Sequence, residues 1–272
     1  MPWNPPEMRE KIPSNSLKAC CESALNRTIS PDLNSNSSIT VVRTVDSATD
    51  PSDFTMLSFL RPSLPPRTER AGQNPVFYEN GRSSLEFRDA GADYSLRNMH
   101  PPMVKGEPLS IMVPPHHYHI KQSEHFRIVS GTVNIYRGLD PQPWKILSDR
   151  DGFEEAAMIP KKIYHRIENA SSTEPLVLDV HLAPEEYEVE QRFFRNFFGY
   201  LDDCKSGNVA PSLFQLLVFL HSADTPLALP FSESWPGVFA SRIFLIGMAF
   251  WGRWILGYKQ TYPEYYLEKK DL

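Results

Sequence analysis

Short runs that alternate apolar and polar residues dominate the middle of the chain, from about residue 74 to 183. They are rich in β-branched and aromatic side chains and are interrupted by Gly, Pro and Asp, which is the pattern of short strands separated by turns. Many short strands with frequent turns are typical of a sandwich or jelly roll, so the fold is predicted to be mainly β. The predicted strands are 76–78, 84–88, 109–113, 117–121, 124–137, 144–147, 154–159, 165–169 and 176–182.

The apolar spacing changes to a helical period at Pro184. Pro fits a first helical turn, and apolar residues then recur three or four apart until Lys205 and Gly207 end the helix. A second helix is predicted from Ser212, as N-cap, to about His221. The aromatic surface of these helices predicts burial against the β domain or across a dimer interface.

A third apolar segment, 238–258, raises the question of a membrane. Its uncharged core, 243–252, is about half the length that a spanning helix needs. Arg242 and Arg253 are eleven residues apart, so on a helix they share one edge. We expect a buried or interface helix, ahead of a helix that lies on a membrane surface and of one that spans a membrane.

Residues 1–70 are rich in Pro, Ser, Asn and Thr, a composition that buries little apolar surface. They are predicted to form an extended, partly disordered arm, and the alternative is that 40–45 or 54–60 lies along the β domain or a partner subunit. The predicted organisation is therefore an arm over 1–70, a β domain over 71–183 and a helical extension over 184–272.

Charge and cysteine content exclude some classes of protein. A formal net charge of −5 without runs of Lys or Arg argues against a nucleic-acid partner. The chain has three cysteines, Cys20, Cys21 and Cys204, and this odd number does not predict a disulfide framework. Prolines and charges stand where a signal peptide would carry an apolar run, so we expect a cytoplasmic protein.

Two segments carry candidate metal ligands. His117 and His119 are two residues apart, so on a strand both imidazoles project from one face, and Glu124 follows within reach. His165 could supply a third imidazole. Three imidazoles and one carboxylate suit Fe, Mn, Ni, Cu or Zn.

The order His117, His119, Glu124, Gly131 resembles the first sequence motif of the cupin superfamily, and Gly152, Pro160, His165, Asn169 resembles the second. Three departures concern turns: Ile111 replaces an opening Gly, the Gly-to-Pro spacing is two residues longer, and Lys162 replaces a Gly. The resemblance implies a cupin jelly-roll barrel with a helical C-terminal extension. A single barrel with an aromatic helical C-terminus is similar to fungal cupins of secondary metabolism.

The resemblance also implies a function. Many cupins with this complete ligand set are dioxygenases, so we expect a non-heme iron oxygenase, with Fe(II) favoured among divalent metals, that acts on a small phenolic, enolic or polyketide-like metabolite. The alternatives are a metal-dependent isomerase, cyclase or decarboxylase, and a binding protein without turnover. His181 could act as a second-shell base or be a hydrogen-bonded core histidine. A homodimer is the expected assembly.

Overall fold

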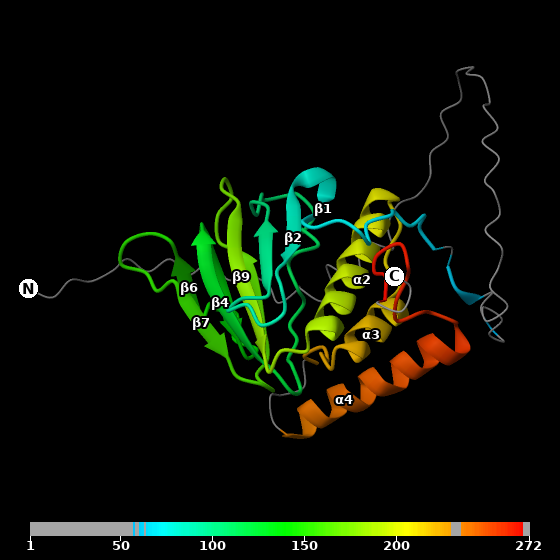
Figure 1. Ribbon diagram of the computed structural model, residues 1–272. Coiled ribbons are helices and arrows are strands. Elements are labelled where there is room, and N and C mark those ends of the chain that lie inside the picture. Colours follow the sequence, from blue (N-terminus) through cyan, green and yellow to red (C-terminus); the bar gives the residue numbers. More distant parts are fainter. Residues whose placement is uncertain (1–56, 58–59, 63, 230–234, 269–272) are drawn as a thin grey trace, which may run out of the picture. The chain divides into compact units, whose positions relative to one another are not determined.

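The structure is a computed structural model that describes residues 57, 60–62, 64–229 and 235–268 (Figure 1). Cys20, Cys21, the segment 40–45 and most of 54–60 lie outside the described residues. All described residues belong to one unit, Asp50–Leu272, in which the strands and the C-terminal helices pack together.

Within the described residues, nine strands form two antiparallel sheets. The larger sheet has the order β1-β2-β3-β9-β4-β7, and the smaller has the order β6-β5-β8. Strands distant in the sequence, such as β3 and β9, are neighbours, as in a jelly roll rather than in a simple meander. The bounds are β1 Val76–Tyr78, β2 Ser83–Phe87, β3 Leu96–His100, β4 Ser123–Ser130, β5 Thr132–Arg137, β6 Lys145–Ser148, β7 Ala156–Ile159, β8 His165–Asn169 and β9 Leu176–Ala183.

Gly131 divides the longest predicted strand in two. Residues 124–137 were expected to form one run, but β4 and β5 belong to different sheets. Gly131 has φ +94°, and a Cβ on it would come within 2.8 Å of the carbonyl oxygen of Pro175. Only Gly allows the chain to cross from one sheet to the other at this point.

Two other strand predictions were wrong. Residues 109–113 form a turn, in which Ser110 Oγ donates to Glu79 Oε2 at 2.5 Å. Residues 117–121 are joined to their neighbours by isolated bridges and not by a continuous ladder. In addition, β3 was missed, because its sequence LRNMH lacks the β-branched and aromatic residues that mark a strand.

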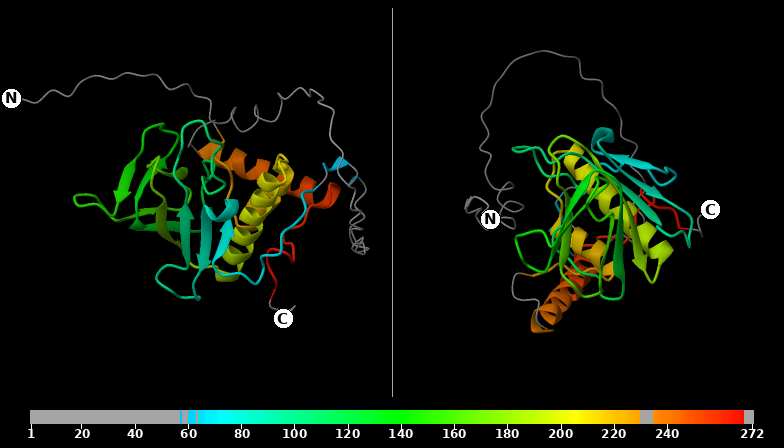
Figure 2. Two further views of the ribbon diagram at one scale, coloured as in Figure 1. Left: turned by 90° about the horizontal axis from the view of Figure 1, so that it is seen from above. Right: turned by 90° about the vertical axis from the view of Figure 1, so that its left-hand side faces the viewer.

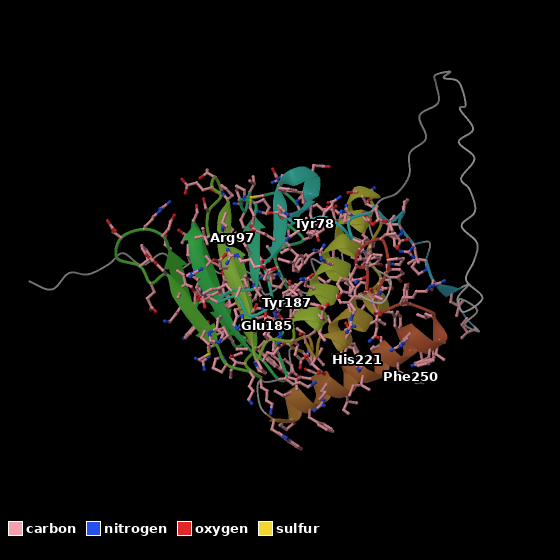
Figure 3. The ribbon with its side chains drawn as sticks, viewed as in Figure 1. Tyr78, Arg97, Glu185, Tyr187, His221 and Phe250 are labelled. Atoms are coloured by element: carbon pink, nitrogen blue, oxygen red, sulfur yellow. The ribbon has the colours of Figure 1, made fainter. Side chains whose placement is uncertain are left out.

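The helices follow the strands in the sequence, and each helix packs against the next one along the chain (Figures 1 and 2). Helix α2 (Tyr187–Ser206) ends before Gly207, and α3 (Leu213–Ser222) has Ser212 as N-cap, as predicted. The aromatic side chains of α2 join the core of the barrel. For example, the ring of Phe198 lies 6.2 Å from that of Tyr78, the last residue of β1, which is labelled in Figure 3. The aromatic surface of α2 is therefore buried within the chain.

The segment just before β1 is bound to α2. Arg70 forms ion pairs with Asp202 at 2.5 Å and Asp203 at 2.7 Å, and the Thr68 hydroxyl donates to Asp203 at 2.7 Å. The last residues of the predicted arm are thus fixed to the helical extension by buried charges.

Helix α4 (Trp235–Phe250) continues as the π-helix η4 (Trp251–Ile255). By length and composition alone, this run is apolar enough to cross a membrane, yet only 22% of its most apolar window is buried. The helix is therefore not buried within the described residues, where a broad apolar face remains uncovered, and the other half of the prediction, an interface helix, stays a prediction.

Candidate metal centre

The segment that carries His117 and His119 is held between two other parts of the chain. On one side, His117 and the first residue of β8, His165, exchange two backbone hydrogen bonds, at 2.9 and 3.1 Å. On the other side, the N–H of Tyr118 donates to Pro226 O at 3.1 Å, and that of Ile120 donates to Asp224 O at 3.0 Å. The loop between α3 and α4 therefore completes the support of the first two ligands.

Lys162 explains how the chain tolerates one departure from the cupin pattern. It occupies the position where the second motif has Gly, and it takes the left-handed conformation with φ +66° that Gly would adopt at lower cost. Its N–H donates to the carbonyl of His119 at 2.8 Å. The turn that aligns the two ligand segments is thus kept without the glycine.

Glu124 comes from β4 and points toward the interior of the barrel. Its cross-strand partners are Ile159 on β7 and Leu182 on β9, and all three residues are buried. Hydrocarbon side chains therefore flank the carboxylate on both sides of its strand.

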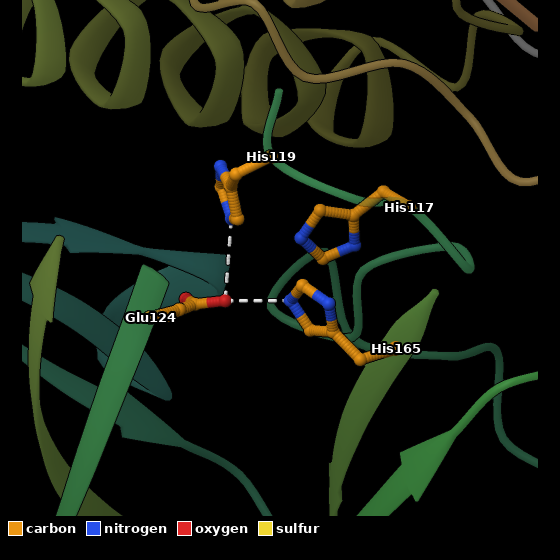
Figure 4. Close-up of side chains that lie close together, drawn as sticks. All are labelled: His117, His119, Glu124 and His165. Carbon is orange, nitrogen blue, oxygen red and sulfur yellow. Dashed lines mark hydrogen bonds and ion pairs between the residues drawn. The ribbon is translucent and has the colours of Figure 1, made fainter. Parts of the chain in front are cut away.

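The four candidate ligands converge (Figure 4). One ligand atom from each of His117, His119, Glu124 and His165 lies within 4.8 Å of every other. Oε2 of Glu124 is 2.7 Å from Nε2 of His165 and 3.3 Å from Nε2 of His119. Three of the residues are buried and His117 is partly exposed, so the cluster reaches the surface at His117.

Backbone carbonyls set the orientation of two imidazoles. Nδ1 of His117 lies 2.9 Å from Pro115 O, and Nδ1 of His165 lies 2.9 Å from Ile163 O. A carbonyl only accepts hydrogen bonds, so Nδ1 carries the hydrogen in both rings. Each Nε2 is then the nitrogen available to a metal.

A threonine from the helical extension orients the third imidazole. The Thr225 hydroxyl donates to Ala223 O at 2.9 Å and lies 3.2 Å from Nδ1 of His119. Because its one hydrogen is used, the hydroxyl accepts from Nδ1, and Nε2 of His119 again faces the cluster. Sequence reasoning missed Thr225, since no motif links it to a histidine 106 residues earlier.

The electrostatics of the cluster favour a cation at its centre. Burial alone raises the pKa of Glu124, but hydrogen bonds from His119 and His165 outweigh it and hold the pKa well below its ordinary value. Burial, reinforced by the neighbouring imidazoles, holds the pKa of His117 well below its ordinary value. The site therefore offers an ionised carboxylate beside a neutral imidazole near pH 7.

The donor set fits a divalent metal. Donors bonded to one metal at about 2.1 Å lie at most about 4.2 Å apart, which is close to the 4.8 Å that bounds the separations of the four atoms here. The hydrogen shared between His165 and Glu124 is lost when a metal binds. The four side chains would hold the ion, and further ligands such as a substrate would complete its coordination.

The structure does not bring His181 to this cluster. His181 pairs with His125 across β9 and β4, with ring centroids 6.1 Å apart, on the face of the sheet opposite Glu124. A role as second-shell base at the metal is therefore not supported. Its Nδ1 is buried without a hydrogen-bond partner among the described residues, so it is not a fully hydrogen-bonded core histidine either.

Comparison with known proteins identifies relatives in fungi. The chain is 30% identical over 219 residues to the probable oxidoreductase virH of Hypocrea virens, covering 76% of this chain and 94% of the relative. It is 33% identical over 134 residues to the oxidoreductase iacF of Pestalotiopsis fici (45% and 59%) and 25% identical over 209 residues to the oxidoreductase AOL_s00215g277 of Arthrobotrys oligospora (74% and 80%). This chain belongs to the family of fungal oxidoreductases that includes virH.

No family model matches the chain. Among solved structures it is similar to the Cnp3 cupin domain of Schizosaccharomyces pombe, with 14% identity over 46% of this chain and 72% of the other at a TM-score of 0.27. It is also similar to KdgF from Halomonas, with 15% identity over 42% and 98% of the two chains at a TM-score of 0.28. TM-scores this low carry no weight, so the jelly-roll assignment rests on the strand order of the two sheets.

Proposed function

We propose that this cupin is an Fe(II)-dependent oxygenase that acts on a small phenolic, enolic or polyketide-like metabolite. The observation that carries the proposal is the cluster of three imidazoles and one carboxylate in a chain whose relatives are named oxidoreductases. This ligand set also accepts Mn, Ni, Zn or Cu, so the metal is itself part of the proposal.

When bound, Fe(II) would supply one-electron redox chemistry and the activation of dioxygen. The chain supplies the setting for that chemistry. Glu124 contributes one negative charge, which offsets half of the charge of a divalent ion, and the three imidazoles keep their Nε2 atoms directed at one point. The carbonyls of Pro115 and Ile163 fix two of those rings before any ligand arrives.

The surroundings of Glu124 favour an uncharged organic ligand. Ile159 and Leu182 flank it across the sheet, and Phe126 follows two residues later on the same face of β4. These side chains exclude water and offer apolar contacts to a ring or a conjugated chain. His117 is the one of the four ligand residues that is partly exposed.

Metal analysis combined with oxygen uptake tests the proposal. Protein purified without added ions is analysed, stripped, reloaded with Fe(II) without air, and placed in an oxygen electrode with a panel of phenols, catechols and enols. We expect bound iron and substrate-dependent oxygen consumption. Nitric oxide added to the Fe(II) protein gives a second readout, because its EPR signal reports iron with an open position whatever the substrate.

The control is the His181→Ala protein, which should behave like the wild type. Zinc or no metal in the purified protein, together with silent oxygen uptake after iron loading, would reject the oxygenase. That result would favour an isomerase, cyclase or decarboxylase that uses its metal as a Lewis acid, or a binding protein without turnover.

A further inference from the structure

The most exposed apolar surface of the described chain lies on α4 and η4. We call it the α4 face, and it carries three tryptophans. Trp235 is 77% exposed, Trp254 60% and Phe250, labelled in Figure 3, 58%. Exposed surface of this kind marks an interaction site in a soluble protein. The residues of the α4 face are Trp235, Phe239, Ile243, Phe244, Ile246, Phe250, Trp251 and Trp254.

The opposite side of the same helix is narrow and buried. Its residues are small or aliphatic, and they include Ser241, Leu245, Ala249 and Gly252. A Cβ on Gly252 would come within 3.0 Å of Val218 on α3, so close contact fixes the helix to its neighbour. Helix α4 lies at the margin of the described unit, against α3 (Figures 1 and 2). The α4 face therefore points away from the barrel.

The charges along this helix have one sign. Arg242 and Arg253 are the charged residues of the run 235–258, both are exposed, and the run contains no Asp or Glu. Eleven residues on a helix bring them to nearly the same angular position, so they share one edge of the α4 face. An apolar face with a cationic edge complements a surface that is apolar inside and anionic outside.

A second copy of the chain does not match this pattern. In a two-fold dimer the same patch meets itself, so the arginine edges would enter an apolar interface with no acid on the α4 face to receive them. Tryptophans, in contrast, are enriched where hydrocarbon meets water at a membrane, because the ring is apolar and its N–H needs a polar partner.

A spanning helix conflicts with the connections at both ends of the run. Near its start, the Tyr118 hydroxyl donates to the carbonyl of Val238 at 2.9 Å. Beyond its end, Tyr262 is buried, and its hydroxyl donates to Gln215 of α3 at 2.6 Å. Both ends thus return to the same folded unit, so the helix can only lie in the plane of a membrane.

We propose that the α4 face binds the surface of a bilayer that contains anionic lipids and holds the cupin there as a peripheral protein. Helix α4 is joined by the Tyr118–Val238 hydrogen bond to a pair of stacked rings, Tyr118 and Tyr164, whose centroids are 5.2 Å apart. Tyr118 lies between His117 and His119, and Tyr164 precedes His165, so docking places the metal-ligand segments next to the lipid surface. This proposal does not depend on the metal or on the reaction.

Sedimentation of the full-length protein with vesicles tests it. One set of vesicles is phosphatidylcholine, and the other is phosphatidylcholine mixed with phosphatidylserine. We expect binding to the anionic vesicles about thirtyfold tighter than to the neutral ones, since each arginine near the surface contributes about fivefold. Arg242→Gln with Arg253→Gln should remove this preference, and high salt should weaken it.

Apolar substitutions test the inserted side chains. Phe250→Ser with Trp254→Ser should weaken vesicle binding by about a hundredfold, because two large side chains lose their burial in lipid. Phe153→Ser is the matched control, since Phe153 is 50% exposed in the loop before β7 and should not affect binding. The tryptophan fluorescence of the wild type should shift to the blue on anionic vesicles.

Three results would overturn the proposal. The first is equal or absent binding to both kinds of vesicle by a folded protein. The second is a stable dimer that Phe250→Ser dissociates without any vesicle binding, which would make the α4 face an interface between copies. The third is a protein that high pH does not extract from vesicles and only detergent releases, which would indicate a spanning helix. If the variant with both Ser substitutions does not fold, the arginine variants still test the proposal.

Discussion

The two faces of the larger sheet use similar residues for different purposes. On the inner face, Glu124 of β4 meets three imidazoles; on the outer face, Asp179 of β9 meets the guanidinium groups of Arg88, Arg97 and Arg127 at 2.7 to 3.0 Å. Both carboxylates are buried and strongly paired. Only the first has partners that can also release a proton and bind a metal.

The difference lies in the chemistry of the partners. An imidazole becomes a neutral ligand near pH 7, whereas a guanidinium keeps its proton and has no lone pair to offer. Burial raises the pKa of Asp179, but hydrogen bonds from the three arginines lower it to about 2. The inner cluster is therefore suited to a metal, and the outer cluster ties β3, β4 and the residue that follows β2 to β9.

The largest expected effect separates the histidines on the two faces. His119→Ala removes one of four ligands and should abolish stoichiometric metal binding, with affinity reduced more than a hundredfold. His181→Ala removes a histidine from the outer face and should leave the metal content unchanged. Metal analysis of both folded proteins measures this, and equal metal content would remove the basis for the assigned ligands.

The next effect concerns the outer carboxylate. Asp179→Asn leaves three arginines without their shared partner and should lower the free energy of unfolding by about 3 kcal/mol, the low end for a buried pair because the arginines are partly exposed. Asp149→Asn, at an exposed carboxylate, should change it by less than about 0.5 kcal/mol. Urea unfolding compares the two, and metal content should stay at the wild-type value. Loss of metal in Asp179→Asn would show that the two faces are coupled.

Lowering the pH also tests the contribution of the Asp179 charge. Asp179 has a lowered pKa in the folded state, so its stabilising effect is present above its ordinary value of 3.8 and is lost as the pH falls toward about 2. The difference in the free energy of unfolding between the wild type and Asp179→Asn should therefore narrow between about pH 4 and pH 2. A constant difference across this range would mean that the charge of Asp179 does not stabilise the fold.

The smallest expected effect is at the oxygen that orients His119. Thr225→Val removes the acceptor for Nδ1 and should weaken metal binding about tenfold, while Thr225→Ser keeps the hydroxyl and should bind as the wild type does. Titration of metal-free protein gives the affinity. If both variants bound equally well, the C-terminal extension would have no part in orienting the ligand.

Local patterns predicted much of the fold. Alternation marked β2, β8 and β9 to within one residue at either end, and the turn and cap residues Gly207 and Ser212 marked the limits of α2 and α3. These features succeed because each depends on neighbours in the sequence. In contrast, β3 has no such local pattern and forms because β2 and β9 pair with it on both sides.

The ligand set was also predicted from the sequence, since spacing and the cupin resemblance named the four residues that the structure brings together. Their orientation was not, because it depends on partners distant in the chain. Thr225 reaches His119 only after α2 and α3 fold back over the barrel. His181 lies away from Glu124 because its register with His125 sets its face, and a shift of one residue would reverse it.

The sequence by itself determined most of the strands and the helices α2 and α3, which residue types can bind a metal, and that 238–258 is apolar with two cations. Only the tertiary structure decided where these features lie. A helix has the same sequence pattern whether a neighbour covers one stripe of it or its whole circumference, and α3 covers one narrow stripe of α4. The exposure of the α4 face and the convergence of the four ligands both depend on packing between segments that are distant in the sequence. Local conformational preferences do not determine such packing.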